Sequence, residues 1–125
     1  YIHAEAYASG ELKHGPIALV DEETPVVFVA PFDGLFDKSL SNLQEVAARR
    51  GEVLLISDAP GLRAAGDTPA HRIEMPECDP FLAPILYSLP VLMLAYHVAT
   101  AAAARTVVAA MARAVGSARV IAKMP

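Results

Sequence analysis

The stretch that decides the fold is the opening run YIHAEAYASGELKHGPIALV, residues 1–20. Within it, the segment ELKHGP, residues 11–16, brings a carboxylate, an ammonium group and an imidazole into four consecutive positions, Glu11 to His14. An imidazole with its ordinary pKa of about 6.5 changes charge near neutral pH and therefore suits proton transfer. From the spacing alone, His14 is either a hydrogen-bonded histidine at a helix end or a residue of a functional site.

The same run contains its own start and stop signals. Residues 9–14 predict a short helix, with the Ser9 hydroxyl as its N-cap. Gly15 and Pro16 predict the end of this helix, because proline cannot continue it and glycine commonly follows a helix end. His14 therefore lies at the end of an element, a place where pockets form.

Strands alternate with helices along the rest of the chain. Apolar or alternating runs predict three strands: residues 26–30, 53–56 and 71–75. Apolar positions at helical spacing predict one helix from residue 35 to a left-handed stop at Gly51, and another from about residue 83 to beyond residue 96. The segment 58–69, rich in Gly, Pro and Asp, predicts a loop. This order predicts an α/β fold with a parallel sheet, in which the first run is the central strand and the third lies nearer the edge.

Composition excludes several functional classes. The net charge of −4 argues against a nucleic-acid partner, which requires clustered Lys and Arg. The single cysteine, Cys78, excludes an intrachain disulfide and a cysteine-based zinc site, and we expect no metal.

Residues 81–104 contain no Asp, Glu, Lys or Arg, and the length and composition of this stretch are those of a membrane span. Pro84 and Pro90 interrupt them, so we favour a helix buried against the sheet or a partner subunit, and we expect no membrane.

The opening run closely resembles the second sugar-isomerase (SIS) domain of the glutamine–fructose-6-phosphate aminotransferase family. The resemblance continues in the same order through PVVFVAP, residues 25–31, and LAYHVA, residues 94–99. After Ala99 an alanine-rich run replaces the charged turn and tail that are typical of the family. The resemblance therefore implies a partial SIS domain over residues 1–99 and a divergent alanine-rich C-terminal helix or tail over residues 100–125.

A three-layer fold, with helices flanking a five-stranded parallel sheet, is what this resemblance implies. Three strands are visible here, so we expect a domain that is incomplete at its N-terminus, in a chain that begins at Tyr1 without a signal peptide. The resemblance implies the isomerase half of an enzyme that moves ammonia from glutamine onto fructose 6-phosphate and forms glucosamine 6-phosphate. It also implies no cofactor, a cytoplasmic homodimer and a fragment that is inactive alone. The alternative is a non-catalytic SIS module for dimerisation or sugar-phosphate-responsive regulation.

Particular residues take roles by the same resemblance. His14 matches a histidine that opens the fructose 6-phosphate ring and serves a neighbouring subunit's site. Lys13 beside it would help to hold negative charge near the substrate, or is a solvated side chain; Glu11 would bind the substrate, or caps or pairs locally. The pattern RVIAK, residues 119–123, is similar to an Arg-x-x-Ala-Lys pattern in the family's C-terminal tail. Lys123 would then form a Schiff base with the open-chain sugar and Ala122 would contact the substrate; the alternative is a chance match.

A phosphate-binding loop of the SIS type is missing from this sequence. SIS domains that hold sugar phosphates use a Ser/Thr-rich loop with glycine at a helix N-terminus, where backbone amides bind the anion. The segment SLSN, residues 39–42, lacks glycine and falls inside a predicted helix. We therefore expect the phosphate to be held by another domain, which the resemblance identifies as the first SIS domain.

Overall fold

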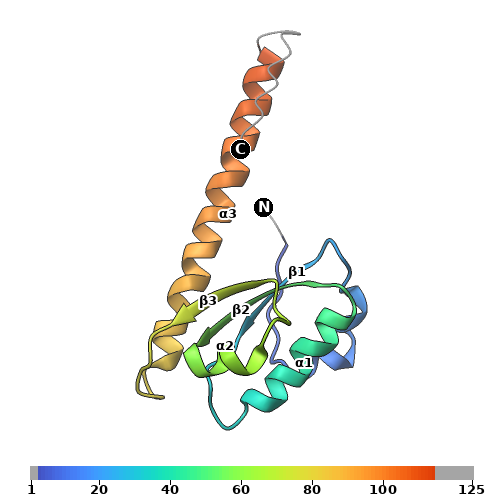
Figure 1. The fold of residues 1–125 in the computed structure, drawn as a ribbon. Helices are drawn as coiled ribbons and strands as arrows, with labels where there is room; N and C mark the ends of the chain where they lie inside the picture. The colour runs from blue at the N-terminus through green and yellow to red at the C-terminus, as the bar shows by residue number, and fades with distance from the viewer. Residues whose placement is uncertain (1–2, 115–125) are drawn as a thin grey trace. The chain divides into compact units, whose positions relative to one another are not determined.

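Strands and helices alternate in the computed structural model, which describes residues 3–114 (Figure 1). The strands are β1 (Pro25–Val29), β2 (Glu52–Asp58) and β3 (His71–Met75). The α-helices are α1 (Phe36–Ala48), α2 (Ala59–Ala65) and α3 (Ala83–Ala114), and two 3₁₀ helices precede them, η1 (Glu11–His14) and η2 (Pro16–Leu19). The chain forms two compact units: residues 4–87 contain the sheet, and residues 88–114 belong to the other.

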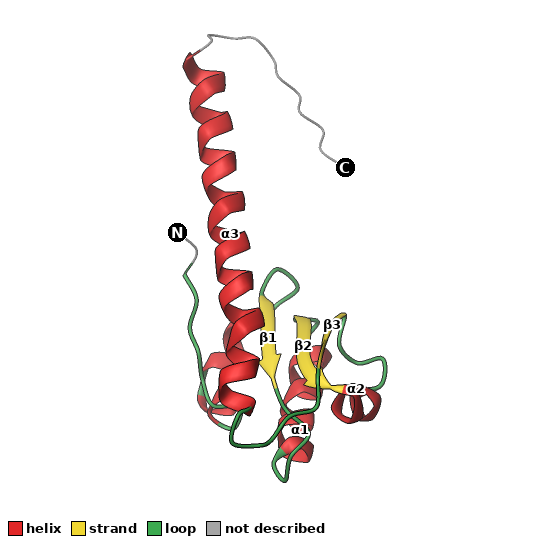
Figure 2. Ribbon diagram, turned by 90° about the vertical axis from the view of Figure 1, so that its left-hand side faces the viewer, coloured by secondary structure: helices red, strands yellow, loops and turns green. Residues whose placement is uncertain are grey.

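The three strands form one parallel sheet in the order β1-β2-β3, which confirms the predicted parallel α/β fold (Figure 2). Phe28 of β1 lies opposite Leu55 of β2. The prediction that the first strand is central is wrong for the described residues, because β2 lies in the middle and β1 at an edge. In β1 the side chains of Val27 and Val29 are 39% and 45% exposed. An uninterrupted apolar run does not by itself distinguish an edge strand from a central one.

Helices α1 and α2 lie on the same face of the sheet (Figure 1). The α1 pattern that predicted a helix places an apolar stripe on the sheet, and Leu43 and Val46 of this stripe are almost fully buried. Each such side chain contributes about 1.5–3 kcal/mol to folding. The buried residues of this core come from β1 and the residue after it, from β2, and from α1 and α2: Phe28, Ala30, Phe36, Leu43, Val46, Val53, Leu55 and Ala65.

The opposite face of the sheet carries a smaller core. Ile56, Met75 and Tyr87 form its buried cluster, and Ala83 and Leu86 from the first turns of α3 pack against it. Residues of β2 alternate between the two faces, as the period of two in a strand requires. The start of α3 therefore supplies a helical layer on the second face within residues 4–87.

Helix α2 falls inside the segment 58–69, which was predicted to be a loop, and that prediction is wrong for residues 59–65. The Asp58 side chain caps the helix by accepting a hydrogen bond from the backbone N–H of Gly61 at 3.1 Å. Pro60 occupies the first turn, where a missing N–H costs nothing. The Asp and Pro that indicated a loop are therefore the residues that start a helix.

The stop of α1 also differs from the prediction. Arg50, not Gly51, adopts the left-handed conformation, with φ of 65°. Glycine is required at position 51 for a different reason: a Cβ atom there would lie 2.6 Å from Cγ1 of Val20 and 2.9 Å from Cγ1 of Val46. Gly51 therefore permits close packing of two chain segments and does not supply the unusual backbone angle.

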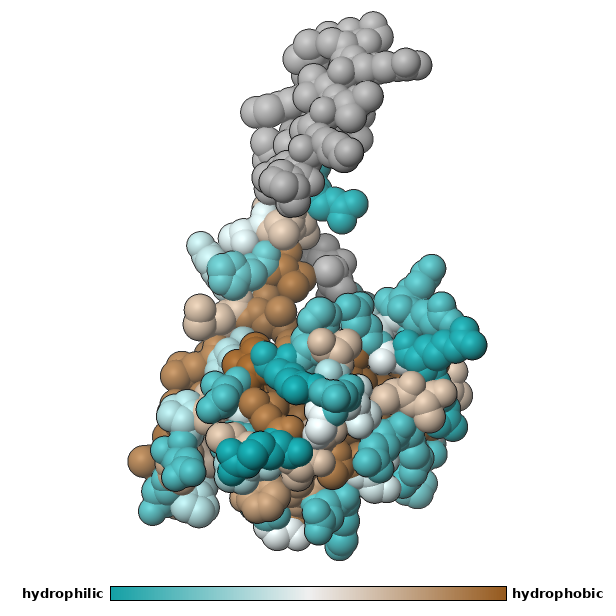
Figure 3. Space-filling view, in the orientation of Figure 1, coloured by the Kyte–Doolittle hydropathy of each residue, from teal (hydrophilic) through white to brown (hydrophobic). Residues whose placement is uncertain are grey.

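The long helix predicted from residue 83 is confirmed as α3, with Pro90 inside it. Its residues 83–103 are long and apolar enough to cross a membrane, and few of these residues are buried. Figure 3 shows apolar side chains along the coloured part of this helix. Leu92 and Met93 are among its exposed residues. Buried core helices and signal sequences pass the same test of length and composition, so this observation alone does not assign a membrane.

Candidate functional site

His14 is the last residue of η1 and is exposed, so it lies at the end of an element as predicted. Gly15 follows it with φ of 149°, a backbone angle that residues with a Cβ atom rarely adopt. Pro16 then begins η2. The predicted stop at Gly15 and Pro16 is therefore confirmed, and it separates two short 3₁₀ helices.

The turn carrying His14 is a 3₁₀ helix over Glu11–His14, shorter than the predicted helix over residues 9–14. Side chains three residues apart in a 3₁₀ helix lie on the same side. This geometry places Glu11 and His14 on one side of the turn and directs Lys13 elsewhere. The structure thus brings two of the three predicted residues onto one side.

Ser9 does not cap this turn, and the prediction of a Ser9 N-cap is wrong. The capping position is Gly10, and no side chain caps η1. The Ser9 hydroxyl instead accepts a hydrogen bond from the side-chain amide of Asn42 at 3.2 Å and lies 3.3 Å from the Ser39 hydroxyl. Ser9 therefore joins the N-terminal segment to α1.

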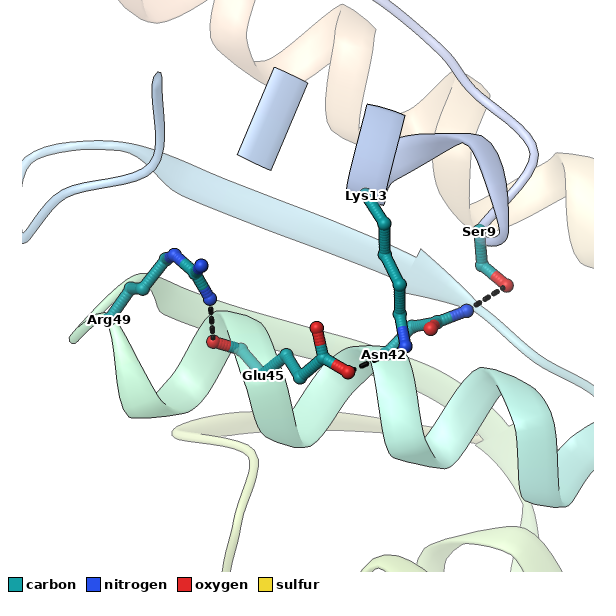
Figure 4. A network of polar contacts seen from close by, with 5 residues as sticks. All are labelled: Ser9, Lys13, Asn42, Glu45 and Arg49. Atoms are coloured by element: carbon teal, nitrogen blue, oxygen red, sulfur yellow. Dashed lines mark hydrogen bonds and ion pairs between the residues drawn. The ribbon is translucent and has the colours of Figure 1, made fainter. Parts of the chain in front are cut away.

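A second contact attaches the end of the turn to the same helix. The Lys13 ammonium group lies 2.5 Å from a carboxylate oxygen of Glu45, and both side chains are 41% exposed (Figure 4). The Arg49 guanidinium donates to the Glu45 carbonyl at 3.2 Å. The Leu12 side chain packs against the core between these polar contacts. The segment 9–14 is thus attached to α1 by the polar contacts of Ser9 and Lys13, and to the core by Leu12.

Asn42 belongs to this arrangement although the sequence reading assigned it no role. The polar residues Ser39, Asn42 and Glu45 recur every three positions and form a stripe beside the apolar stripe of α1. Asn42 is only 5% exposed, which is unusual for an asparagine. The spacing of three residues between these polar positions, next to the apolar stripe, is the sequence signal that could have identified Asn42.

A separate cavity of about 250 Å³ lies beyond the carboxyl ends of the strands. In open parallel sheets this edge is the usual place for ligands. The lining residues come from the segments that follow β1 and β3, from the last residue of β2 and from the start of α3: Pro31, Phe32, Asp33, Asp58, Pro76, Cys78, Pro80, Ala83, Pro84 and Tyr87. The sequence reading did not identify this cavity, because its residues are dispersed along the chain.

Two polar groups of the cavity have defined states. Both carboxylate oxygens of Asp58 accept backbone hydrogen bonds, from Phe32 at 3.2 Å and from Gly61 at 3.1 Å. The Tyr87 hydroxyl is buried without a hydrogen-bond partner. Burial, and secondarily the negative charge of Asp58, raises the pKa of Tyr87 to about 12. The Asp58 side chain thus joins the segment after β1 to the start of α2. Tyr87 stays neutral over the physiological pH range.

Metal binding finds no support within residues 3–114, where no three His, Cys, Asp or Glu side chains are grouped as a metal site requires. Cys78 is free and exposed. The two remaining predicted site residues, Ala122 and Lys123, lie outside the described part of the chain. The described candidates for chemistry are therefore the turn with His14 and the cavity at the strand ends.

Known proteins resemble this chain over most of its length. The glutamine–fructose-6-phosphate aminotransferase (isomerizing) of Rhizobium meliloti (strain 1021) is 58% identical over 99 residues, which make up 79% of this chain and 16% of that protein. A protein of the same name from Sphingobium yanoikuyae is 57% identical over 99 residues, or 79% of this chain and 64% of that protein. The chain therefore spans less than two thirds of the length of these relatives.

A solved structure gives the same result for the fold. The C-terminal domain of glucosamine-fructose-6-phosphate aminotransferase from Francisella tularensis has a TM-score of 0.75 and 50% sequence identity, covering 80% of this chain and 28% of that one. The model of the SIS domain family matches residues 1–102. These matches confirm the resemblance to the C-terminal part of glutamine–fructose-6-phosphate aminotransferases, and the chain belongs to the SIS domain family.

Proposed function

We propose that this chain forms part of the isomerase half of a glutamine–fructose-6-phosphate aminotransferase. Such an enzyme moves ammonia from glutamine onto fructose 6-phosphate and isomerises the product to glucosamine 6-phosphate. The observation that carries the proposal is the attached turn of residues 11–14, which presents an exposed His14 within the stretch that resembles this family. The names and identities of the matching relatives support the same assignment.

In this proposal His14 transfers a proton during opening of the sugar ring. Ring opening moves a proton between the anomeric hydroxyl and the ring oxygen, and imidazole does this well near neutral pH. His14 is exposed at the end of η1, so its ring is accessible to a substrate held by another domain or by a neighbouring subunit. Of these two arrangements, we prefer the one in which His14 acts on a substrate bound by the neighbouring subunit.

Glu11 and Lys13 are proposed to bind the substrate beside His14. Glu11 lies on the same side of the 3₁₀ turn and can accept hydrogen bonds from sugar hydroxyls. Lys13 is paired with Glu45 in this structure. A phosphate or sugar oxygen of the substrate could replace the Glu45 carboxylate as the partner of the Lys13 ammonium group. Lys123 is proposed to form a Schiff base with the open-chain sugar, with Ala122 contacting the substrate next to it.

We further propose a soluble, cytoplasmic homodimer that needs no cofactor and binds no nucleic acid. The net charge of −4 supports the last point. The exposed valines of the edge strand β1, Val27 and Val29, support association with another protein surface. The chain alone is proposed to be inactive, because a phosphate-binding loop of the SIS type is missing from its sequence.

The cavity at the strand ends gives little support to the alternative of a sugar-phosphate-responsive module. Asp33 and Asp58 line it, and carboxylates repel a phosphate. Ser39 and Ser41 lie inside α1 and not in a loop at its N-terminus. The catalytic proposal is therefore preferred over the regulatory one.

The test is the substitution His14→Ala in the full-length gene product. We expect sugar isomerisation to fall by about 10²- to 10⁴-fold, while glutamine hydrolysis and the melting temperature stay unchanged. The matched control is His71→Ala, because His71 is exposed like His14 but lies at the start of β3, where it contacts the carboxylate of Glu52. An equal loss of both activities with a lower melting temperature would reassign His14 to structure.

A further inference from the structure

We infer that Asn42 is a positioning residue, whose side-chain amide fixes the segment 9–14 and thereby sets the location of the His14 imidazole. The inference rests on the proposed function, because it assigns Asn42 a role in presenting His14 to a substrate. No predicted site residue lies on α1. Asn42 therefore adds a second element to the site.

The first argument is the burial of Asn42 and its satisfied amide. Asn42 is 5% exposed near the middle of α1, and its amide nitrogen donates to the Ser9 hydroxyl at 3.2 Å. A buried amide that loses its partner costs about 1–3 kcal/mol in general. This hydrogen bond joins residues 33 positions apart in sequence and is therefore a tertiary contact.

The second argument compares the two polar attachments of the turn. The ion pair between Lys13 and Glu45 has side chains that are 41% exposed, and such pairs are screened by water and salt. The hydrogen bond between Asn42 and Ser9 is partly buried and directional. Of the two, the Asn42 contact is therefore the one that fixes the geometry, and the ion pair adds to it.

The third argument is the path from Ser9 to His14. Residues 11–14 form one tight 3₁₀ turn, and the Glu11 N–H donates to the Ala8 carbonyl at 2.9 Å across Ser9 and Gly10. The segment from Ser9 to His14 is thus internally bonded, so a shift of Ser9 moves the whole turn. A displacement of about 1 Å at a reacting group can lower a rate by about 10²-fold.

The network drawn in Figure 4 shows how the two attachments are arranged. Asn42 and Glu45 lie one turn apart on α1 and point toward Ser9 and Lys13, respectively. His14 directly follows the second attachment in sequence. Two anchors of different strength, placed before and within the turn, restrict the position of the backbone at the residue that follows.

The experiment removes the hydrogen bond from either end and follows the His14 ring by NMR. Asn42→Ala, Ser9→Ala and the double variant are made in the 125-residue chain, and the ring signals are assigned with His14→Gln. We expect the His14 ring signal to shift in all three variants, and at least as far in Ser9→Ala, which also removes the contact with the Ser39 hydroxyl, while the His71 ring signal does not move. Ser9→Thr keeps a hydroxyl and should restore the wild-type signal.

The same variants in the full-length gene product measure the effect on the reaction. We expect sugar isomerisation to fall by about 10- to 100-fold with little change in KM or in glutamine hydrolysis. If Asn42→Ala does not fold, Ser9→Ala decides alone, because it removes the same hydrogen bond from outside the helix.

The outcomes separate this inference from the function it rests on. A His14 signal that does not move in Ser9→Ala would overturn the positioning role. A signal that moves while isomerisation is unchanged would uphold the anchoring by Asn42 and reject the catalytic role of His14. A lower melting temperature with an unmoved signal would also count against positioning, because Asn42 would then act on stability alone.

Discussion

The hydroxyl oxygen of Ser57 lies 2.1 Å from the point that a Cβ atom on Gly61 would occupy. Ser57 is fully buried and donates a hydrogen bond to the Ala30 carbonyl at 2.5 Å. The contact brings the start of α2 against the end of β2. It also links β2 to the residue that follows β1, so one hydroxyl fixes three segments near the cavity.

The first prediction concerns Gly61→Ala. The added methyl group would also meet a ring carbon of Phe36 at 2.9 Å, so neighbouring groups must shift. Overpacking of this kind costs about 1–3 kcal/mol, and urea unfolding should show a loss of that size. Gly34→Ala is the matched control, because nothing lies within 4 Å of its Cβ position. Equal stability of the two variants would contradict the packing described for Ser57.

The second prediction concerns the pair of substitutions Ser57→Ala and Gly61→Ala. Ser57→Ala alone removes a buried hydrogen bond and should cost about 1–3 kcal/mol. It also removes the oxygen that collides with a Cβ atom at position 61. The double variant should therefore be less destabilised than the sum of the single variants in a double-mutant cycle. Strict additivity would show that the two side chains do not share this space.

The third prediction concerns Gly15→Ala. The φ angle of 149° at Gly15 is strained for alanine even though nothing lies within 4 Å of its Cβ position. We expect a loss of about 1–3 kcal/mol in the free energy of unfolding. Gly10→Ala separates backbone strain from loss of flexibility, because Gly10 has φ of −66° and the same open surroundings. Destabilisation by both substitutions to the same extent would rule out strain as the cause.

The fourth prediction is an alkaline loss of stability due to Tyr87. Its pKa is raised to about 12 in the folded chain, against about 10 for an ordinary tyrosine. Below pH 10 both states are protonated and the group has no pH effect. Between about pH 10 and 12 the unfolded state releases the proton first, so stability falls as pH rises. Absorbance at alkaline pH should show one late tyrosine transition.

Tyr87→Phe tests this assignment. The variant should lose the late transition and the associated fall in stability. At neutral pH it should be as stable as the wild type or more so, because the hydroxyl has no hydrogen-bond partner. A marked loss of stability at neutral pH would mean that the hydroxyl is bonded in solution.

The fifth prediction is self-association of the 125-residue chain. Val27 and Val29 expose apolar surface on β1, which also has an unpaired edge in the described sheet. Light scattering at micromolar concentration should detect a dimer or larger species. Charged substitutions at Val27 and Val29 should shift the chain toward the monomer, and a monomeric wild-type chain would contradict the prediction.

The sequence predicted the strands and the two longer helices because their apolar patterns are strong. The run 53–56 is continuous and apolar, and residues 71–75 alternate, so both strands were found close to their observed bounds. The sequence-based prediction was wrong where polar residues or prolines occur in loops and also at helix N-termini. Asp58 and Pro60 indicated a loop, yet they start α2.

The candidate site was only partly predictable. The end of an element at His14 followed from Gly15 and Pro16, which are local signals. The bond between Ser9 and Asn42 and the cavity at the strand ends depend on residues far apart in sequence. No local pattern determines which hydroxyl meets which amide, so these contacts required the folded arrangement.

The tight contact at Gly51 restricts the order in which mutations can accumulate. Every replacement of glycine adds a Cβ atom, which here meets Val20 at 2.6 Å and Val46 at 2.9 Å. Valine has little rotational freedom with which to move aside. A lineage could therefore change position 51 only after both valines had become smaller, and the reverse order would pass through a poorly folded intermediate.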